Sequence, residues 1–412
     1  MALEFKETTV DNNGNRSTTP DNNPAKKGRS SVHVAKEYLE EFYDFRYNTI
    51  TNTLEIKRRD ESVYKEANEN DLLCELLEEG IRISDKLLKV ILSSSFVPQY
   101  NPFIEYFENL PKWDKNKPDY IKELASYIKA KDPARFEKHF RKMFVRIVRS
   151  VYEANYYNKH CFVLVHDKQN SGKTTFCEFL CPKSLKDYMT SEFSPNDKDS
   201  LIALTENILI NLDELATLSK ADLNQLKSVF SKTYIKVRKP YARKASVAYR
   251  VASFVGSTNN LEFLTDETGS VRWLCFEIEG IDWAYRHKVD MDNVYAQALY
   301  LYKNGIENGQ LTAEEIAENE IINRIYQVTT IEMHALQNNY EPCDENDPNA
   351  LKLTTSEVLT EFSELFKQVG HKSNIIVLGR ALKYLGYRQV TIRDNGIPVK
   401  KWVLKKAEKV VF

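Results

Sequence analysis

The spacing of apolar residues divides the first part of the chain into a polar leader and a helical region. Residues 1–30 carry almost no apolar side chains, so this leader is expected to be disordered. Across residues 31–157, apolar positions recur at three- and four-residue spacing, which predicts a mainly helical domain. Within it, the alternating stretch Phe45–Ile56 predicts a hairpin.

The last long helix of this region has two chemically different faces. Residues 133–157 combine one apolar stripe with a basic face formed by Arg135, Lys138, Arg141, Lys142, Arg146 and Arg149. A solvated face on a packed helix is the favoured interpretation, and contact with DNA is the alternative.

The pattern changes at Cys161, where short apolar runs of strand length begin. These runs are CFVLV, ENILINL and SVAYRVASFVGS, and helical segments lie between them. Buried strands that alternate with helices indicate an α/β fold with a mostly parallel sheet covered on both faces. We assign residues 158–285 to this core domain.

The rest of the chain is predicted to hold an acidic helical segment with a linker (286–349) and a basic domain (350–412). In the basic domain, two helical segments precede alternating strands, and Asn395-Gly396 between those strands is a strong hairpin signal. Helices followed by a basic hairpin predict a winged-helix-like C-terminal domain.

Charge becomes informative only when it is read locally. The chain has 58 Lys and Arg against 59 Asp and Glu, for a net charge of -1. Yet residues 232–250 contain seven basic residues and no acidic one, and residues 367–412 contain eleven basic residues against two acidic ones. Residues 300–350 show the reverse, with two basic and ten acidic residues. Such basic segments keep nucleic acid open as a partner.

Composition excludes several protein classes. Hydrophobic residues at 42% and charged residues at 28% are typical of a globular protein and exclude a disordered or collagen-like chain. The six cysteines are scattered, which disfavours a zinc site or a disulfide framework. No stretch approaches the roughly 18 apolar residues of a membrane span, so we expect a cytoplasmic protein without a membrane partner.

A phosphate-binding loop is predicted directly after the first strand. The sequence HDKQNSGKTT ends in Gly172-Lys173-Thr174, the end of the pattern G-x-x-x-x-G-K-[ST], although Asp167 stands at the first glycine position. Such a loop needs backbone N–H groups for phosphate oxygens, an ammonium for the β and γ phosphates and a hydroxyl for Mg²⁺. The expected nucleotide-binding residues are Asp167, Lys168, Gln169, Asn170, Ser171, Gly172, Lys173, Thr174 and Thr175.

Acidic, amide and guanidinium groups follow at later strands. Asp213 and Glu214 end the apolar run ILINL, where an acid can hold Mg²⁺ together with Thr174 and a following Glu can polarise water. Asn259 follows the next strand and could orient that water, although Asn is also common in turns. Arg272 is a candidate arginine finger, and by itself it would more often be a surface residue.

The acid-free segment between these motifs has the composition of a single-strand DNA contact. Its basic residues could follow phosphates while its tyrosines meet bases. The alternative is an exposed basic loop that binds no DNA. The candidate DNA-binding residues are Lys236, Arg238, Lys239, Tyr241, Arg243 and Lys244.

In their order, these motifs resemble the virulence-associated E (VirE-type) family of P-loop ATPases, which are related to superfamily 3 helicases of phages and mobile elements. The resemblance rests on GKTTF, LDEL, KTYIKVRKPYARK and SFVGSTNNLEFLTDETGSVRW, and upstream on YNPFIEYFENLPKWD. It implies an AAA+-like ATPase core that assembles as a ring, with a hexamer as the expected size, and that moves on single-stranded DNA.

On this resemblance, Lys173 and Thr174 are the Walker A residues and Asp213 and Glu214 the Walker B pair. Asn259 is the sensor, and Arg272 reaches the ATP of a neighbouring subunit. The basic segment becomes a hairpin that faces the central pore, the helical domain becomes a collar for oligomerisation, and a separate primase is a further partner. ATP and Mg²⁺ are the implied cofactors.

Two functional hypotheses follow. The first is an ATP-dependent ring-forming DNA helicase or translocase in the replication of a phage or mobile element. The second is an initiator or regulator, in which the C-terminal domain recognises duplex DNA and ATP controls assembly without unwinding. A small-molecule P-loop kinase is disfavoured, because it would explain neither Arg272 nor the basic segment.

Overall fold

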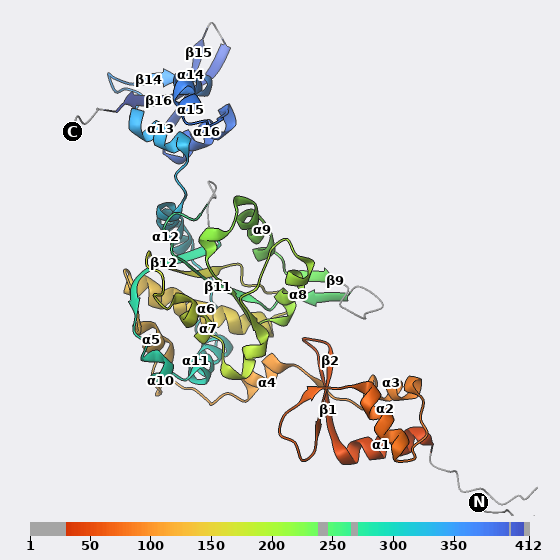
Figure 1. Ribbon diagram of the computed structural model, residues 1–412. Coiled ribbons are helices and arrows are strands. Elements are labelled where there is room, and N and C mark those ends of the chain that lie inside the picture. The colour runs from red at the N-terminus through yellow and green to blue at the C-terminus, as the bar shows by residue number, and fades with distance from the viewer. Residues whose placement is uncertain (1–29, 238–245, 265–270, 395–396, 408–412) are drawn as a thin grey trace, which may run out of the picture. The chain divides into compact units, whose positions relative to one another are not determined.

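The computed structural model describes residues 30–237, 246–264, 271–394 and 397–407, and this part of the chain forms two compact units that divide after Asn101 (Figure 1). Each unit has its own cluster of buried apolar side chains.

The first unit packs helices against a small sheet, so it is mixed rather than mainly helical. Its sheet has the order β3-β2-β1-β4, with β1 antiparallel to β2 and parallel to β4. The expected hairpin is confirmed, and Asn52 takes a left-handed backbone conformation at its turn, with a φ of 59°. The elements are α1 (Ser31–Phe42), β1 (Tyr43–Asn48), β2 (Thr53–Arg58), β3 (Lys65–Glu66), α2 (Glu69–Glu78), α3 (Asp85–Leu92) and β4 (Gln99–Tyr100).

The second unit is built on a mostly parallel sheet, as the apolar runs predict. Its strand order is β5-β12-β6-β11-β8-β7; the pairings from β12 to β7 are parallel, and β5 joins β12 antiparallel. The strands are β5 (Ile128–Ala130), β6 (Cys161–Val165), β7 (Met189–Thr190), β8 (Leu209–Leu212), β11 (Ser253–Thr258) and β12 (Trp273–Ile281).

Helices cover both faces of this sheet, which explains why every residue of β6, β8 and β11 is buried. On one face, the rings of Phe136 and Phe140 from α6 pack against Phe162 of β6. On the other face, alternate strand residues join a core with side chains from α8 and α9. The helices are α4 (Pro102–Glu108), α5 (Tyr120–Ser126), α6 (Pro133–Tyr152), α7 (Lys173–Phe179), α8 (Lys198–Glu206), α9 (Lys220–Phe230), α10 (Tyr285–Lys288), α11 (Met291–Lys303) and α12 (Ala313–Asn323). Short 3₁₀ helices are η1 (Lys183–Tyr188), η2 (Leu215–Thr217) and η3 (Arg324–Tyr326).

The expectation of a solvated basic face on α6 is wrong for half of its cations. Arg135, Lys142 and Arg146 are buried, with 6%, 7% and 1% exposure. Lys142 Nζ donates to both carboxylate oxygens of Glu315 on α12, at 2.9 and 2.7 Å. Arg146 donates to the carbonyl oxygen of Gly309 at 3.0 Å. Because these acceptors come from residues more than 160 positions away, the pattern within the helix alone could not reveal the burial.

The same packing explains why the compact units differ from the expected domain boundaries. Helix α6 belongs to the sheet-containing unit, although residues 31–157 were expected to form a domain of their own. Helix α11 packs on α6, where Phe144 and Tyr295 meet edge to face at 5.2 Å. Residues on both sides of the predicted core domain therefore bury their apolar faces against it.

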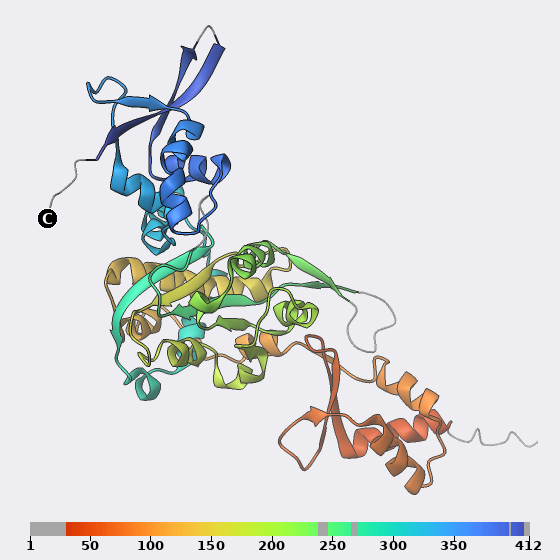
Figure 2. The ribbon, with the colours of Figure 1, turned by 45° about the horizontal axis from the view of Figure 1, so that its top comes forward.

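The basic segment after α9 begins and ends as an antiparallel pair, β9 (Tyr234–Val237) and β10 (Ser246–Tyr249), which extends away from the central sheet (Figure 2). Residues 238–245 lie outside the described part of the chain.

The C-terminal helices and an antiparallel sheet pack around an apolar cluster of their own. Helices α14 to α16 precede the hairpin of β15 and β16, and the winged-helix expectation rests on this order. Strands β13 and β14 pair with β16, so part of the predicted linker is built into this sheet. The elements are α13 (Ile331–Asn339), β13 (Tyr340–Pro342), β14 (Leu351–Leu353), α14 (Thr355–Glu361), α15 (Ser363–Gln368), α16 (Ile375–Tyr384), β15 (Arg388–Asp394) and β16 (Ile397–Lys406). Within the described residues, no helix is long and apolar enough to cross a membrane.

Candidate nucleotide-binding site

The predicted phosphate-binding loop joins the end of β6 to the start of α7. Asn170 and Gly172 take positive φ values of 55° and 84°, which is the region that favours Asn and Gly. Asp167 does not have a positive φ, and its side chain is 72% exposed. The turn therefore does not require glycine at position 167, where the sequence departs from the usual pattern.

Lys173 is nearly buried, at 5% exposure, and its ammonium lies inside this loop. Its Nζ donates to Asn259 Oδ1 at 2.6 Å and to Ser171 Oγ at 2.8 Å. The carbonyl oxygens of His166 and Lys168 lie 3.2 Å from the same atom. Burial lowers the pKa of Lys173, and the nearby carboxylate of Asp213 opposes this shift. The loop thus surrounds the cation with neutral oxygens.

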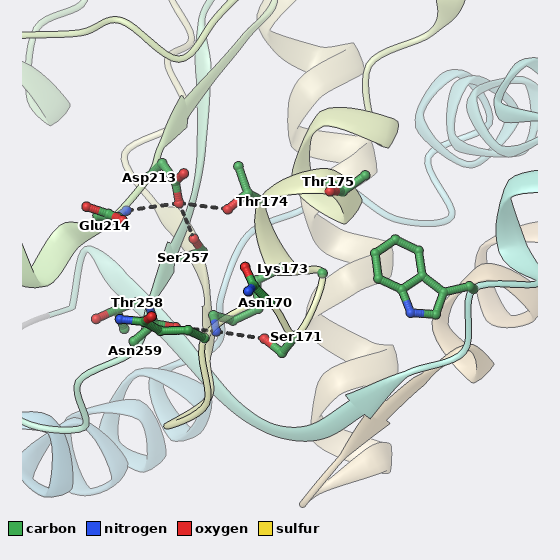
Figure 3. Close-up of a pocket in the computed structure, with 13 residues that line it drawn as sticks. Asn170, Ser171, Lys173, Thr174, Thr175, Asp213, Glu214, Ser257, Thr258 and Asn259 are labelled. Carbon is green, nitrogen blue, oxygen red and sulfur yellow. Dashed lines mark hydrogen bonds between the residues drawn. The ribbon is translucent and has the colours of Figure 1, made fainter.

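Asp213 follows β8 and meets residues from two other elements (Figure 3). Thr174 Oγ1 donates to Asp213 Oδ1 at 2.9 Å, and Ser257 Oγ at the end of β11 donates to the same oxygen at 2.5 Å. The backbone N–H of Glu214 donates to it as well, at 3.0 Å. Because the carboxyl ends of parallel strands share one edge of the sheet, residues 83 positions apart in sequence converge on one carboxylate.

These residues line one pocket of about 530 Å³ at that edge of the sheet. Of the expected nucleotide-binding residues, Gln169 to Thr175 line it, and Asp167 and Lys168 are not part of the lining. Asp213, Glu214 and Asn259 also line it, so the structure brings these candidates together with Lys173. Glu214 is exposed and takes a left-handed backbone conformation, with a φ of 49°.

Arg272 lies at the opposite end of the sheet. Strands β6 and β12 run parallel with Cys161 opposite Trp273, so Arg272 precedes its strand, whereas Lys173 follows the end of β6. The carbonyl oxygen of Arg272 accepts from Cys161 N at 2.8 Å, and its guanidinium donates to Ser231 Oγ at 3.2 Å. The structure therefore does not place Arg272 in the pocket of its own chain.

A protein-family model matches the central part of the chain. The Virulence-associated protein E-like domain matches residues 107–328, which is more than half of the sequence. The chain belongs to the VapE-like domain family. This confirms the resemblance that the motif order indicates.

Solved structures match the chain at low sequence identity. The apo structure of the NrS-1 C-terminal region (305–718) has 14% identity and a TM-score of 0.50, over 92% of the VapE-like chain and 100% of that chain. The A form of the same region has 13% identity and a TM-score of 0.47, over 92% and 100%. SCCmec type IV Cch, an active helicase, has 11% identity and a TM-score of 0.30, over 82% and 71%. No curated protein matches the chain.

The predicted DNA-binding segment of the VapE-like chain is described only in part. Lys236 is exposed on β9, whereas Arg238, Lys239, Tyr241, Arg243 and Lys244 lie outside the described residues. Next to Lys236, Tyr234 and Tyr249 face each other across the strand pair and are 55% and 47% exposed. One face of the pair thus presents aromatic and basic side chains to solvent.

Sequence reasoning missed three residues of the pocket, Ser257, Thr258 and Trp283. Ser257 stands two positions before Asn259, and the alternation of side chains along β11 could have placed both on the same face of the sheet. Trp283 lies beyond β12, and no motif marks it. Among the described residues, no group of three His, Cys, Asp or Glu side chains is arranged to hold a metal ion.

Proposed function

We propose that this VapE-like protein hydrolyses ATP and uses the free energy to move along single-stranded DNA. The observation that carries the proposal is the contact of Thr174 with Asp213, at 2.9 Å, beside the buried ammonium of Lys173. A P-loop site uses a hydroxyl and a carboxylate for Mg²⁺, and an ammonium for the β and γ phosphates.

The residues fit a magnesium nucleotide. Mg²⁺ is usually held by one or two carboxylates together with substrate phosphates, and Asp213 and Thr174 supply the protein ligands for such a site. Bound there, Mg²⁺ would neutralise charge on the phosphates. Lys173 now donates to neutral oxygens of its own loop, so phosphate oxygens would be stronger acceptors for the same ammonium.

Two further side chains are suited to direct the attacking water. Glu214 is exposed at the pocket, where its carboxylate can accept a hydrogen bond from water and align it for attack. The amide of Asn259 already contacts Lys173 at 2.6 Å, so it can sense whether that ammonium turns toward a phosphate.

Arg272 can act only on a pocket other than its own, given its place at the opposite end of the sheet. An arginine finger supplied in trans would complete the site of a neighbouring subunit, which requires a closed ring in which every pocket meets one Arg272. We propose a ring, with a hexamer as the expected size. The face formed by Tyr234, Lys236 and Tyr249, together with the basic residues that follow it, is the proposed contact for single-stranded DNA.

A second candidate is an ATP-controlled initiator or regulator that binds duplex DNA through its C-terminal domain. It is favoured by the excess of basic residues in positions 367–412 and by the exposed side chains of Arg388, Arg393 and Lys400 on β15 and β16. Two exposed isoleucines at the start of α16, Ile375 and Ile376, do not suit a helix that reads the polar floor of a DNA groove.

The decisive experiment measures ATP hydrolysis by the purified full chain with and without single-stranded DNA. Wild-type protein should hydrolyse ATP faster when the DNA is present, and Lys173→Ala should lower the rate by about a hundredfold or more, because the phosphates lose their buried cation. Lys129→Ala, which removes an exposed lysine on the edge strand β5, is the matched control and should keep the wild-type rate. Hydrolysis that ignores DNA, or that survives Lys173→Ala, would contradict the proposal.

A further inference from the structure

An exposed tryptophan stands beside the phosphate-binding loop without a role in the mechanism above. Trp283 is 44% exposed and lines the same pocket as Lys173 and Thr174. A Cβ atom added to Gly172 would lie only 2.6 Å from its Cζ2 atom. The indole therefore packs so closely against the loop backbone that only glycine fits at position 172, while nearly half of the Trp283 surface is exposed to solvent.

We propose that Trp283 is the platform on which the base of a purine nucleoside triphosphate stacks. The inference rests on the proposed nucleotide-binding function and extends it from the phosphates to the base. In this pocket, polar groups gather at Lys173 and Asp213, and the indole of Trp283 adds an aromatic surface to the lining, which is the chemical complement of a heterocyclic ring.

The backbone around Trp283 is fixed, so the ring is presented from a rigid support. Asp282 N donates to the carbonyl oxygen of Tyr127 at 2.8 Å, and its carboxylate accepts from Ala284 N at 2.9 Å. Tyr285, which is fully buried, packs edge to face on Phe176 and Phe179 of α7 at 5.1 and 4.7 Å. The segment that carries Trp283 is thus anchored on the helix that begins with Lys173.

A cation supports the indole from one side. The guanidinium carbon of Arg286 lies 4.5 Å from the centre of the Trp283 ring, which is the distance of a cation–π contact. Arg286 also lines a second pocket of about 650 Å³, and this pocket shares Thr175 with the first. A nucleotide whose phosphates occupy the loop can therefore extend past Thr175 with its base against the indole.

The test separates the base from the phosphates. Binding of ATP and of inorganic tripolyphosphate, each with Mg²⁺, is measured by calorimetry on the full-length wild type and on Trp283→Ala and Trp283→Phe. Because stacking on an aromatic side chain is worth a factor of about ten or more per base, Trp283→Ala should weaken ATP binding by about tenfold and leave tripolyphosphate binding unchanged. Trp283→Phe keeps an aromatic face and should retain most of the ATP affinity.

Fluorescence gives a second readout that does not depend on stability. The chain has four tryptophans. ATP should quench the emission of wild type and of Trp113→Phe, but not that of Trp283→Phe, and tripolyphosphate should quench none of them.

Three outcomes would overturn the inference, and they differ in what else they affect. If Trp283→Ala binds ATP as tightly as wild type, the base lies elsewhere and the proposed function stands. If it loses ATP and tripolyphosphate equally, Trp283 only shapes the loop, and the proposed function again stands. If wild type binds neither ligand, the proposed function fails and the base site fails with it.

Discussion

Two buried lysines of the second unit show how different the surroundings of the same charge can be. Lys142 on α6 is 7% exposed, and Lys173 at the start of α7 is 5% exposed. Lys142 is neutralised by the carboxylate of Glu315, at 2.7 and 2.9 Å, and also donates to the carbonyl oxygen of Gln310 at 2.8 Å. Lys173 donates only to neutral oxygens and faces an open pocket.

This difference distinguishes a buried cation with a structural role from one that is available to bind an anion. A buried charge is costly unless it is paired, and Lys142 has the pairing that a permanent structural role needs. Lys173 is solvated by groups that a phosphate can replace, so its positive charge is still free to attract an anion. Burial by itself does not separate the two residues, whereas the charge of their partners does.

The largest expected effect is on ATP hydrolysis, and it comes from a third cation, Arg272. Like Lys173, Arg272 has a neutral hydrogen-bond partner. Its guanidinium donates to Ser231 Oγ, and if it serves the pocket of a neighbour, Arg272→Ala should lower kcat for ATP by about a thousandfold. The affinity for ATP should stay within about threefold of wild type, because the phosphates keep Lys173. Steady-state kinetics and calorimetry measure the two quantities.

Mixing two inactive proteins shows whether Arg272 acts across subunits. When Arg272→Ala and Lys173→Ala are combined, some interfaces join an intact Lys173 pocket to an intact Arg272, and hydrolysis should partly return. A mixture as inactive as its components would show that Arg272 does not act in trans.

A smaller effect is expected at Lys142, and it should appear in stability rather than in activity. Lys142→Ala leaves the buried carboxylate of Glu315 without its closest cation, which should lower the free energy of unfolding by about 3 kcal/mol. Urea denaturation measures this loss, and KM for ATP should stay within about twofold. Lys138→Ala is the matched control, because Lys138 reaches the same carboxylate from a 47% exposed position and should cost about 0.5 kcal/mol or less. Equal losses in the two variants would refute the comparison.

The smallest expected effect is the pH dependence of the stability that Glu315 contributes. Although burial raises the pKa of Glu315, hydrogen bonds from Lys142, Thr312 and Lys138 outweigh it and lower the pKa from 4.5 to about 2. The stability from these bonds is present above pH 4.5 and is lost as the pH falls toward 2, because the unfolded chain takes up the proton first. Between pH 7 and pH 4, wild type should lose about 1 kcal/mol more than Glu315→Gln does. Urea denaturation at both pH values checks this, and parallel losses would contradict it.

The sequence predicted features that depend on neighbours along the chain. The apolar run Cys161–Val165 predicted a buried strand, and GKT after it predicted a loop whose lysine lies at the start of a helix. The site could be assembled because parallel strands bring their carboxyl ends to one edge, so Asp213 and Asn259 were expected beside Lys173.

Features that depend on distant partners could not be predicted. The burial of Lys142 requires Glu315, which stands 173 positions later, and a basic stripe looks the same in sequence whether water or a carboxylate covers it. The small strand β5 consists of three residues at the end of a helical pattern and pairs with β12 far along the chain. Trp283 reaches the pocket because Tyr285 anchors its segment on α7, a contact without a sequence motif.

The order of strands in the central sheet has a consequence for how the chain is made. Strand β6 lies between β11 and β12, and its partner Trp273 follows Cys161 by 112 positions. At about 5–20 residues per second of synthesis, on the order of ten seconds pass before the ribosome delivers that partner. Until β11 is made, the run CFVLV, which is wholly buried in the finished fold, has neither neighbour to pair with, and until β12 is made it has only one. Nascent chains of this protein should therefore need chaperones most while residues 161–281 are being translated.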